Sequence, residues 1–169
     1  MIIVAPRTAA KESAMQTDKF TALVRNALMS AQNDALAANH QKVTAAHLLR
    51  ALLADDNVTI RSLIGRAGGD LDALQAKLDK AIAAIPAVTG SGADQLQLDI
   101  ELARILQAAE SESKSLGDSF LAVDALLLAM VKSRNAIGGI LKESGVDAAR
   151  VRSAIADMRK GRTADSDAA

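Results

Sequence analysis

Several residue types are absent or rare in this chain of 169 residues, and each absence excludes a class of protein. The chain contains no cysteine, which excludes a disulfide framework and thiolate metal sites and is compatible with a reducing cytosol. Tyrosine and tryptophan are also absent, and Phe20 and Phe120 are the two phenylalanines. The aromatic platforms on which single-stranded nucleic acids stack are therefore missing.

The charge balance and the lack of long apolar runs narrow the class further. The 20 basic and 20 acidic residues cancel, so no overall field attracts nucleic acid or an anionic membrane. The apolar run at residues 2–5 is far shorter than the roughly 7 to 15 residues of a signal-peptide core. We therefore expect a cytoplasmic protein whose partners are neither nucleic acid nor membrane.

What the chain does contain is helical periodicity. Apolar residues recur every three or four positions, which is typical of amphipathic helices. The pattern predicts a first helix over about residues 18–38 with Thr17 as its N-cap, and Thr44 as the cap of a second helix. Gly68 suits the end of a third helix, and Asp70 suits the start of a fourth.

The same pattern then occurs a second time. A shift of 78 residues places Phe20 on Leu98, and a shift of 77 places Gly68 on Gly145, because one loop of the second copy is a residue shorter. Each copy, at about 65 residues, is too small to bury its apolar faces alone. The sequence therefore predicts an all-α fold of about eight helices, arranged as two pseudo-twofold-related four-helix repeats.

The expected organisation places one domain between two less structured ends. Residues 1–14 are expected to be an extension that is disordered or not native to the protein, and residues 162–169 are expected to begin a flexible linker. The domain itself spans residues 15–161, with repeat one at 15–85, a linker rich in glycine and serine at 86–96, and repeat two at 97–161.

No residue pattern in the chain indicates catalysis. His40 and His47 lack the third ligand that a metal site needs, and "GSG" at residues 90–92 lacks the lysine and the strand of a phosphate loop. The serines lack a paired base. We expect no enzymatic activity, no metal and no cofactor in this chain. A cation such as Arg159, in the last helical turn, is expected to stabilise the helix C-terminus.

Two acidic residues of the second repeat allow two interpretations. Asp118 follows Gly117 in "LGDSF", and Asp124 lies in the first turn of a helix that no capping side chain precedes. A carboxylate there can stabilise the start of the helix through backbone donors and the helix dipole. Alternatively, the two carboxylates form the polar rim of an apolar binding surface.

Two related segments carry a family resemblance. "NHQKVTAAHLLRALL" and "GDSFLAVDALLLAM" resemble the motif G-H-x-x-[hydrophobic]-T-x-E-H-L-L of the Clp N-terminal repeat domain, from about residue 15 to residue 161. "IPAVTGSG" and "MRKGRTADS" are similar to the subgroup found in ClpB-type disaggregases. The chain departs from the family pattern at Ala46, Ala122 and Asp124, where an acidic residue, a Ser or Thr cap and a glutamate are common.

The resemblance implies a substrate-binding N-terminal module of an ATP-dependent disaggregase. Such a module would engage unfolded or aggregated polypeptides for threading by an AAA+ motor beyond Ala169, with a DnaK-type chaperone system as partner. The isolated domain would be a monomer and the full-length protein a hexamer. Family motifs implicate Thr17, Asp118 and Asp124 around a groove between the repeats, and Leu121 and Leu116 are the apolar candidates.

Two alternatives remain open at this stage. The chain could be the adaptor-docking N-domain of a ClpA- or ClpC-type protease unfoldase, or a free-standing Clp-repeat scaffold protein without a motor.

Overall fold

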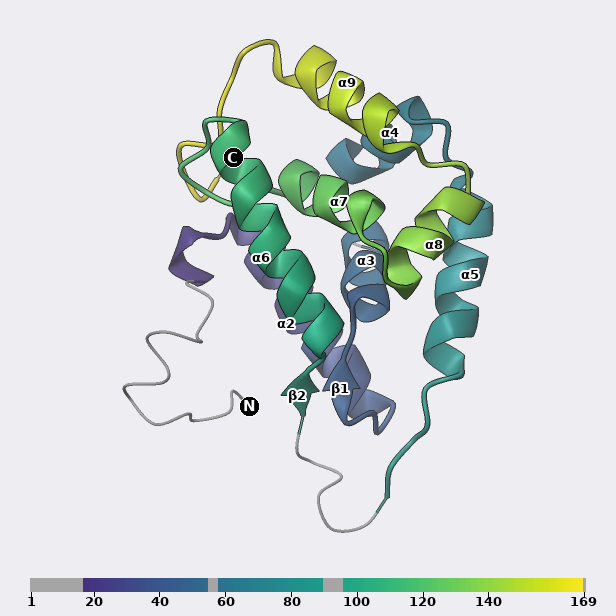
Figure 1. The fold of residues 1–169 in the computed structure, drawn as a ribbon. Coiled ribbons are helices and arrows are strands. Elements are labelled where there is room, and N and C mark those ends of the chain that lie inside the picture. Colours follow the sequence, from purple (N-terminus) through teal and green to yellow (C-terminus); the bar gives the residue numbers. More distant parts are fainter. Residues whose placement is uncertain (1–16, 55–57, 90–95, 169) are drawn as a thin grey trace.

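The computed structural model describes residues 17–54, 58–89 and 96–168, and these residues are almost entirely helical (Figure 1). The first half contains a 3-10 helix, a two-residue strand and four α-helices: η1 (Thr17–Lys19), α2 (Ala22–Ala37), β1 (Lys42–Val43), α3 (Ala45–Ala54), α4 (Val58–Arg66) and α5 (Leu71–Ala83). The second half contains one two-residue strand and four α-helices: β2 (Gln97–Leu98), α6 (Ile100–Ser115), α7 (Val123–Lys132), α8 (Ala136–Glu143) and α9 (Ala148–Arg159). The predicted all-α class is confirmed. The predicted extension at 1–14 and linker residues 90–95 lie outside the described residues.

The first long helix starts later than the sequence pattern predicts. Its N-cap is Thr21, whose hydroxyl accepts a hydrogen bond from the backbone N–H of Val24 at 3.4 Å. The preceding residue, Phe20, is extended and forms a parallel backbone bridge with Leu121. Because an extended residue cannot belong to a helical turn, α2 begins only after this bridge. Thr17 is therefore not the cap of α2 and lies in η1 instead.

The start of the fourth helix in each repeat follows the sequence closely. Asp70 caps α5 by accepting a hydrogen bond from the N–H of Ala73 at 3.1 Å. Asp147 caps α9 in the same way, with the N–H of Arg150 at 3.0 Å. The predicted cap at Asp70 is confirmed, and its aligned residue in the second repeat has the same role.

Two short bridges join the repeats symmetrically. Val43 of β1 pairs with Leu98 of β2, and Phe20 pairs with Leu121, in both cases in parallel. The repeat shift of 78 residues exchanges the two bridges, since it carries Phe20 to Leu98 and Val43 to Leu121. In each bridge, the residue after Leu98 or Phe20 donates its N–H to the carbonyl oxygen of Val43 or Leu121, at 3.0 Å. The predicted pseudo-twofold relation is thus visible in the backbone.

The two repeated glycine turns cross each other at the pseudo-twofold axis. Gly68 and Gly145 adopt left-handed φ values of 91° and 89°. A Cβ on Gly145 would lie 2.6 Å from the carbonyl oxygen of Gly68, and a Cβ on Gly68 would lie 3.1 Å from that of Gly145. Reciprocal hydrogen bonds flank this contact. Asp70 and Asp147 each donate an N–H to the residue before the glycine of the other repeat, at 2.9 and 3.4 Å.

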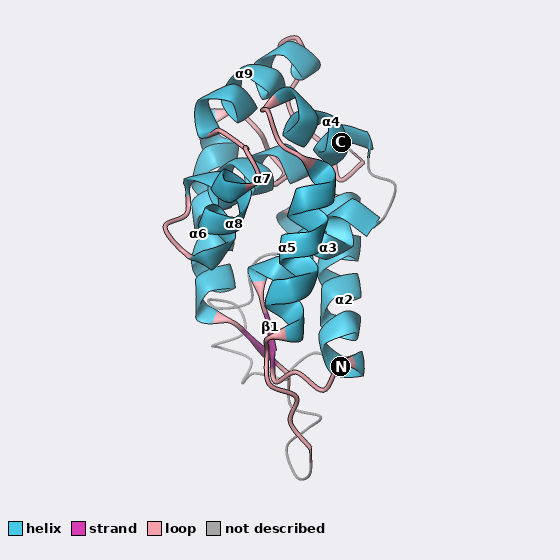
Figure 2. Cartoon of the chain, turned by 90° about the vertical axis from the view of Figure 1, so that its right-hand side faces the viewer, coloured by secondary structure: helices cyan, strands magenta, loops and turns pink. Residues whose placement is uncertain are grey.

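Helices α3 and α7, which are equivalent in the two repeats, form the centre of the fold (Figure 1). All residues from 123 to 131 of α7 are buried, and so is most of α3. Around them, α4 packs on α9 at one end of the molecule and α5 packs on α8 (Figure 2). Each pair joins the third helix of one repeat to the fourth helix of the other, so the repeats share one core. Within the described ranges, no helix is both long and apolar enough to cross a membrane.

Replacing a glycine at the axis should destabilise the whole domain. We expect Gly145→Ala to lower the free energy of unfolding by about 2 kcal/mol or more, because a left-handed φ is unfavourable for alanine and its Cβ would press on the Gly68 carbonyl. Gly139→Ala is the matched control, since it lies inside α8 and its Cβ would have no atom within 4 Å. That variant should be more stable by about 0.5–1 kcal/mol. Urea denaturation measures both, and equal stability of the two variants would contradict the crossing.

Candidate functional site

Asp118, Asp124 and Arg159 form an ion-paired cluster in repeat two. The Arg159 guanidinium donates two hydrogen bonds to Asp118, at 2.6 and 2.8 Å, and two to Asp124, at 2.6 and 2.7 Å. The side chain of Asp118 is fully buried, and those of Asp124 and Arg159 are 10% and 15% exposed. The structure therefore brings together the two carboxylates that the sequence singles out, and it turns them inward.

The ends of three helices position these side chains. Helix α6 ends in a turn at Gly117, whose φ is 76°, and Asp118 follows it. Asp124 lies in the first turn of α7, and one of its oxygens accepts the N–H of Ala125 at 2.8 Å. The N-cap residue of α7 offers no capping side chain, so this carboxylate interacts with backbone at the helix start, as the first interpretation predicts. Arg159 is the last residue of α9.

The cluster contains two negative charges and one positive charge. Burial alone would lower the pKa of the Arg159 guanidinium, but its hydrogen bonds and ion pairs with Asp118 and Asp124 outweigh burial and raise that pKa. The backbone N–H of Ala164 also donates to Asp118, at 2.8 Å, and the N-terminus of α7 adds a favourable dipole near Asp124. Arg159 thus pairs with two carboxylates, a role that the helix-terminal position predicted from the sequence does not include.

The segment after α9 returns across this cluster. The carbonyl oxygen of Ala164 accepts hydrogen bonds from the N–H groups of Ser119 and Phe120, at 3.0 and 2.9 Å. Three residues later, the carbonyl of Asp167 accepts the N–H of the first residue of α2 at 2.7 Å, and its carboxylate pairs with Arg25 at 3.4 Å. Ala164 is buried. Residues 163–167 therefore contact the domain, which differs from the flexible linker that the sequence predicts from residue 162.

The other predicted site residues lie around the Phe20–Leu121 bridge. Leu121 is buried in the bridge itself, and Leu116, at the C-cap of α6, is half-buried against the core. Thr17 begins η1, the short helix that leads into Phe20. The structure thus gathers the predicted residues into one region of the fold.

Sequence reasoning missed three members of this region: Arg159 as a partner of the carboxylates, Ala164 and Asp167. A partial signal existed for Arg159, because two carboxylates close together need a cation. Several cations end α9, however, and their spacing does not say which one turns inward. No local pattern marks Ala164 or Asp167, because their contacts depend on the path of the tail.

A surface lies around each of the two bridges. The two surfaces are related by the pseudo-twofold axis, but their side chains differ in chemistry. We call the surface around the Phe20–Leu121 bridge the first junction and the surface around the Val43–Leu98 bridge the second junction. The first junction carries exposed or half-buried apolar side chains: Leu23, Leu116 and Phe120. A shift of 78 residues places these positions, in the same order, on Glu101, Ala38 and Lys42. The second junction has apolar side chains of its own, because Ile100 is exposed and Leu96 and Leu98 are half-buried.

The second junction contains a buried histidine pair where the first contains the ion-paired cluster. His40, which aligns with Asp118, has its Nδ1 2.9 Å from Nε2 of His47. Thr44 donates its N–H to Nδ1 of His47 at 3.0 Å, and its hydroxyl accepts the N–H of His47 at 3.4 Å. This reciprocal cap confirms Thr44 as a capping residue. In the part of the chain that the structure describes, no three potential metal ligands come together.

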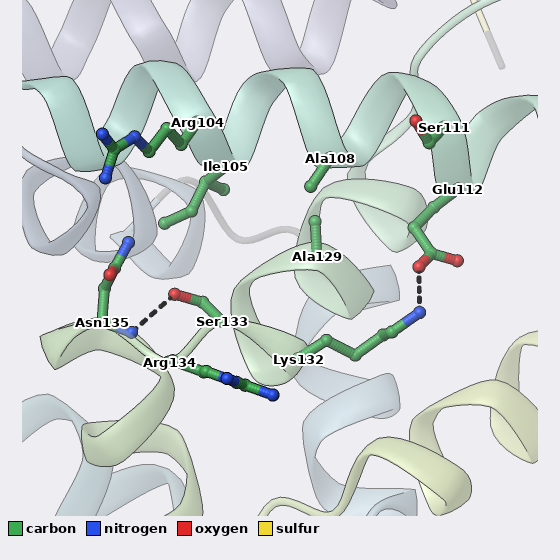
Figure 3. A pocket seen from close by; sticks show the side chains of 10 residues that line it. All are labelled: Arg104, Ile105, Ala108, Ser111, Glu112, Ala129, Lys132, Ser133, Arg134 and Asn135. Carbon is green, nitrogen blue, oxygen red and sulfur yellow. Dashed lines mark hydrogen bonds and ion pairs between the residues drawn. The ribbon is translucent and has the colours of Figure 1, made fainter.

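A separate hollow of about 420 Å³ lies between α6 and the turn that joins α7 to α8 (Figure 3). Ile105 and Ala129 contribute apolar surface to it, and the cations Arg104, Lys132 and Arg134 also line it. Lys132 is paired with Glu112. None of the residues predicted from the sequence lines this hollow.

The fold and these contacts define a duplicated helical domain, in which Asp118, Asp124, Arg159 and the two histidines hold buried structural contacts. The pattern of the family described as the Clp repeat (R) N-terminal domain matches residues 19–144. The chain belongs to this family, whose N-domains are non-catalytic modules.

Relatives agree with this assignment. The chain is 42% identical over 153 residues to the chaperone protein ClpB of Rhizobium meliloti and to that of Agrobacterium fabrum. The match covers 90% of this chain but 18% and 17% of those proteins, so the chain spans less than a fifth of their length. The Hsp104 N-terminal domain from Candida albicans has a similar structure, with a TM-score of 0.76, 20% identity, and 88% of this chain and 97% of that chain covered. A complex of a ClpV N-domain with a VipB peptide gives a TM-score of 0.66, 21% identity and 95% coverage of both chains.

Removing Asp118 should destabilise the domain. We expect Asp118→Ala to lower the free energy of unfolding by about 3 kcal/mol, because Arg159 loses one of its two carboxylates and the N–H of Ala164 loses its acceptor. Asp165→Ala is the control, since this exposed carboxylate bonds the neighbouring Thr163 hydroxyl and should matter by less than about 0.5 kcal/mol. Urea denaturation compares the variants. An Asp118→Ala protein as stable as the control would show that the cluster adds no stability.

Stability should also fall in mild acid because of His47. Burial lowers the pKa of His47 most, and the nearby His40 and Arg50 lower it further, to about 4 from 6.5, although Asp34 acts in the opposite direction. Between pH 6.5 and pH 4 the unfolded chain binds a proton at this histidine, and the folded chain does not. The contribution of neutral His47 to the free energy of unfolding is therefore complete above pH 6.5 and declines as the pH falls towards 4. The loss should be on the order of 3 kcal/mol.

The matched variant for this pH dependence is His47→Gln. Glutamine can still accept the N–H of Thr44, but it does not titrate. Unfolding experiments at several pH values should give a flatter stability profile between pH 4 and 6.5 for this variant than for the parent. Parallel profiles would show that His47 is not responsible.

Proposed function

We propose that this chain is the substrate-binding N-terminal module of an ATP-dependent disaggregase of the ClpB type. In this proposal it engages exposed segments of unfolded or aggregated polypeptides at the first junction. The similarity to ClpB chaperones over 90% of the chain supports the class of protein. The full-length protein would be a cytoplasmic hexamer with an AAA+ motor outside this chain, and it would work with a DnaK-type chaperone system.

The observation that carries the choice of surface is the asymmetry of the two junctions. Leu23, Leu116 and Phe120 of the first junction align with charged or small residues of the second: Glu101, Ala38 and Lys42. The second junction keeps apolar surface elsewhere, at Ile100 and the half-buried Leu98. An unfolded segment can bury its apolar side chains on the first junction. Because the surface is small and a flexible ligand loses entropy on binding, we expect a dissociation constant of tens of micromolar or weaker. Such weak binding would let segments pass on to a motor.

The main part of the two carboxylates in this proposal is to position other groups. Asp118 and Asp124 are paired with Arg159 and point inward, so they act as positioning residues that hold the segment carrying Phe120 and Leu121. Thr17 would contribute through η1, which precedes the bridge.

Adaptor docking, as proposed for a ClpA- or ClpC-type N-domain, is the second candidate. The observation that favours it is the ClpV N-domain complex, in which a domain of this fold holds a VipB peptide. A single defined peptide that binds far more tightly than unfolded protein would support this second function over the first.

Replacing an apolar side chain of the first junction with a polar one should weaken binding of unfolded protein. We expect Leu23→Ser to weaken binding of a fluorescently labelled, reduced and alkylated test protein by roughly three- to tenfold, since it removes part of the apolar contact. Glu101→Ser, at the equivalent position of the second junction, is the matched control and should bind like the parent. Fluorescence anisotropy measures both. Equal losses for the two variants, or no loss for Leu23→Ser, would contradict the proposed surface.

A further inference from the structure

Residues 119–121, a bend followed by the bridge residue, have hydrogen-bond partners on two sides. On one side, the N–H of Leu121 donates to the carbonyl of Lys19 at 2.8 Å, within the bridge to repeat one. On the other side, the N–H groups of Ser119 and Phe120 donate to the carbonyl of Ala164. The two N–H groups of this bend are therefore occupied by the tail of the same chain.

Repeat one has a related arrangement. After α5 the chain returns to the turn that follows α2, where the N–H of Val88 donates to the carbonyl of Asn39 at 2.8 Å. Asn39 aligns with Gly117, and both adopt positive φ values, 59° and 76°. The fold thus guides a returning segment past the same turn in each repeat, which makes the tail contact a feature of the architecture.

We propose that the two N–H groups of Ser119 and Phe120, which converge on one carbonyl and are called the docking edge below, form a docking site for a short polypeptide segment. The segment has a small residue followed three positions later by an acidic residue, and residues 164–167 are its intramolecular occupant. This inference rests on the proposed function, because it names the kind of segment that the first junction takes up.

Three contacts define that segment. The backbone of the small residue is held from both sides, because its carbonyl accepts from Ser119 and Phe120 and its N–H donates to Asp118. Its side chain must be small, since Ala164 is only 3% exposed. The acidic residue faces the Arg25 guanidinium, which is fixed by a second hydrogen bond to a carbonyl of the bridge at 2.9 Å.

The tail and an outside segment compete for the same edge. Because the tail is tethered, its effective concentration at the edge is high, and an outside segment must displace it. The apparent affinity of the site for an outside segment is the intrinsic affinity multiplied by the fraction of molecules in which the tail is not docked. Asp118 bonds both Arg159 and Ala164, so the buried cluster links the end of α9 to the docked tail.

Releasing the tail should therefore raise peptide binding. Ala164→Gln puts a larger side chain at a buried position of the tail. Asp167→Ala removes the ion pair with Arg25, and the Asp167 side chain is 57% exposed. In both variants we expect faster hydrogen exchange of the Ser119 and Phe120 amides. A labelled peptide with the sequence TADSDAA should bind the Ala164→Gln variant roughly five- to tenfold more tightly than the parent. For Asp167→Ala the gain should be about two- to fivefold, because an exposed ion pair contributes little. Asp165→Ala is the control and should match the parent in both measurements.

The outcomes separate this inference from the proposed function. Unchanged amide exchange in both variants would contradict the tail as occupant, and faster exchange without tighter peptide binding would contradict the edge as a docking site. A TADSAAA peptide that binds as well as TADSDAA would contradict the acidic requirement. If unfolded test protein binds the parent through Leu23 but these variants gain nothing, only the inference fails. If the variants gain peptide binding while Leu23→Ser binds unfolded protein normally, only the proposed function fails.

Discussion

The close approach of Gly68 and Gly145 is the constraint on which the rest of the structure depends. Each glycine turn ends the third helix of its repeat and leads into the cap of the fourth. The crossing of the two turns therefore fixes the relative positions of four helices. Neither turn can carry a Cβ without pressing on the backbone of the other repeat. The helices that leave the crossing pair across the repeats, and the central helices α3 and α7 pack between them. One backbone contact thus commits two small units to a shared core.

Duplication has conserved this backbone frame while the chemistry at the junctions diverged. Aligned positions hold His40 in one repeat and Asp118 in the other. The first is part of a histidine pair that helps cap α3, and the second belongs to a cluster with Arg159 that ties the end of α9 to the start of α7. Both solutions satisfy buried polar atoms, as burial requires. Because the frame is the same, a difference in surface chemistry is informative about function.

The site combines a rigid base with a surface suited to weak contacts. Paired and buried carboxylates hold the segment between α6 and α7, which presents Phe120 beside the first turn of α2. A surface with few exposed apolar side chains cannot bind a flexible chain tightly, since the entropy of ordering opposes the contact. In the proposed docking, the tail that crosses the same segment adds a second level of control, because its position decides whether the N–H groups of Ser119 and Phe120 are available.

The sequence by itself determined the helical class, the duplication, the family and the caps at Thr44 and Asp70. These features depend on local rules: a period of three to four residues, a hydroxyl or carboxylate at a helix start, and glycine where φ is positive. Only the tertiary structure decided where α2 begins, which cation neutralises Asp118 and Asp124, and where the tail runs. Each of these depends on a contact between residues far apart in the chain, such as the bridge that keeps Phe20 extended or the 41-residue separation between Asp118 and Arg159. Spacing along the sequence shows which side chains share a helix face, but the direction in which a buried charge turns is set by partners that packing alone brings together.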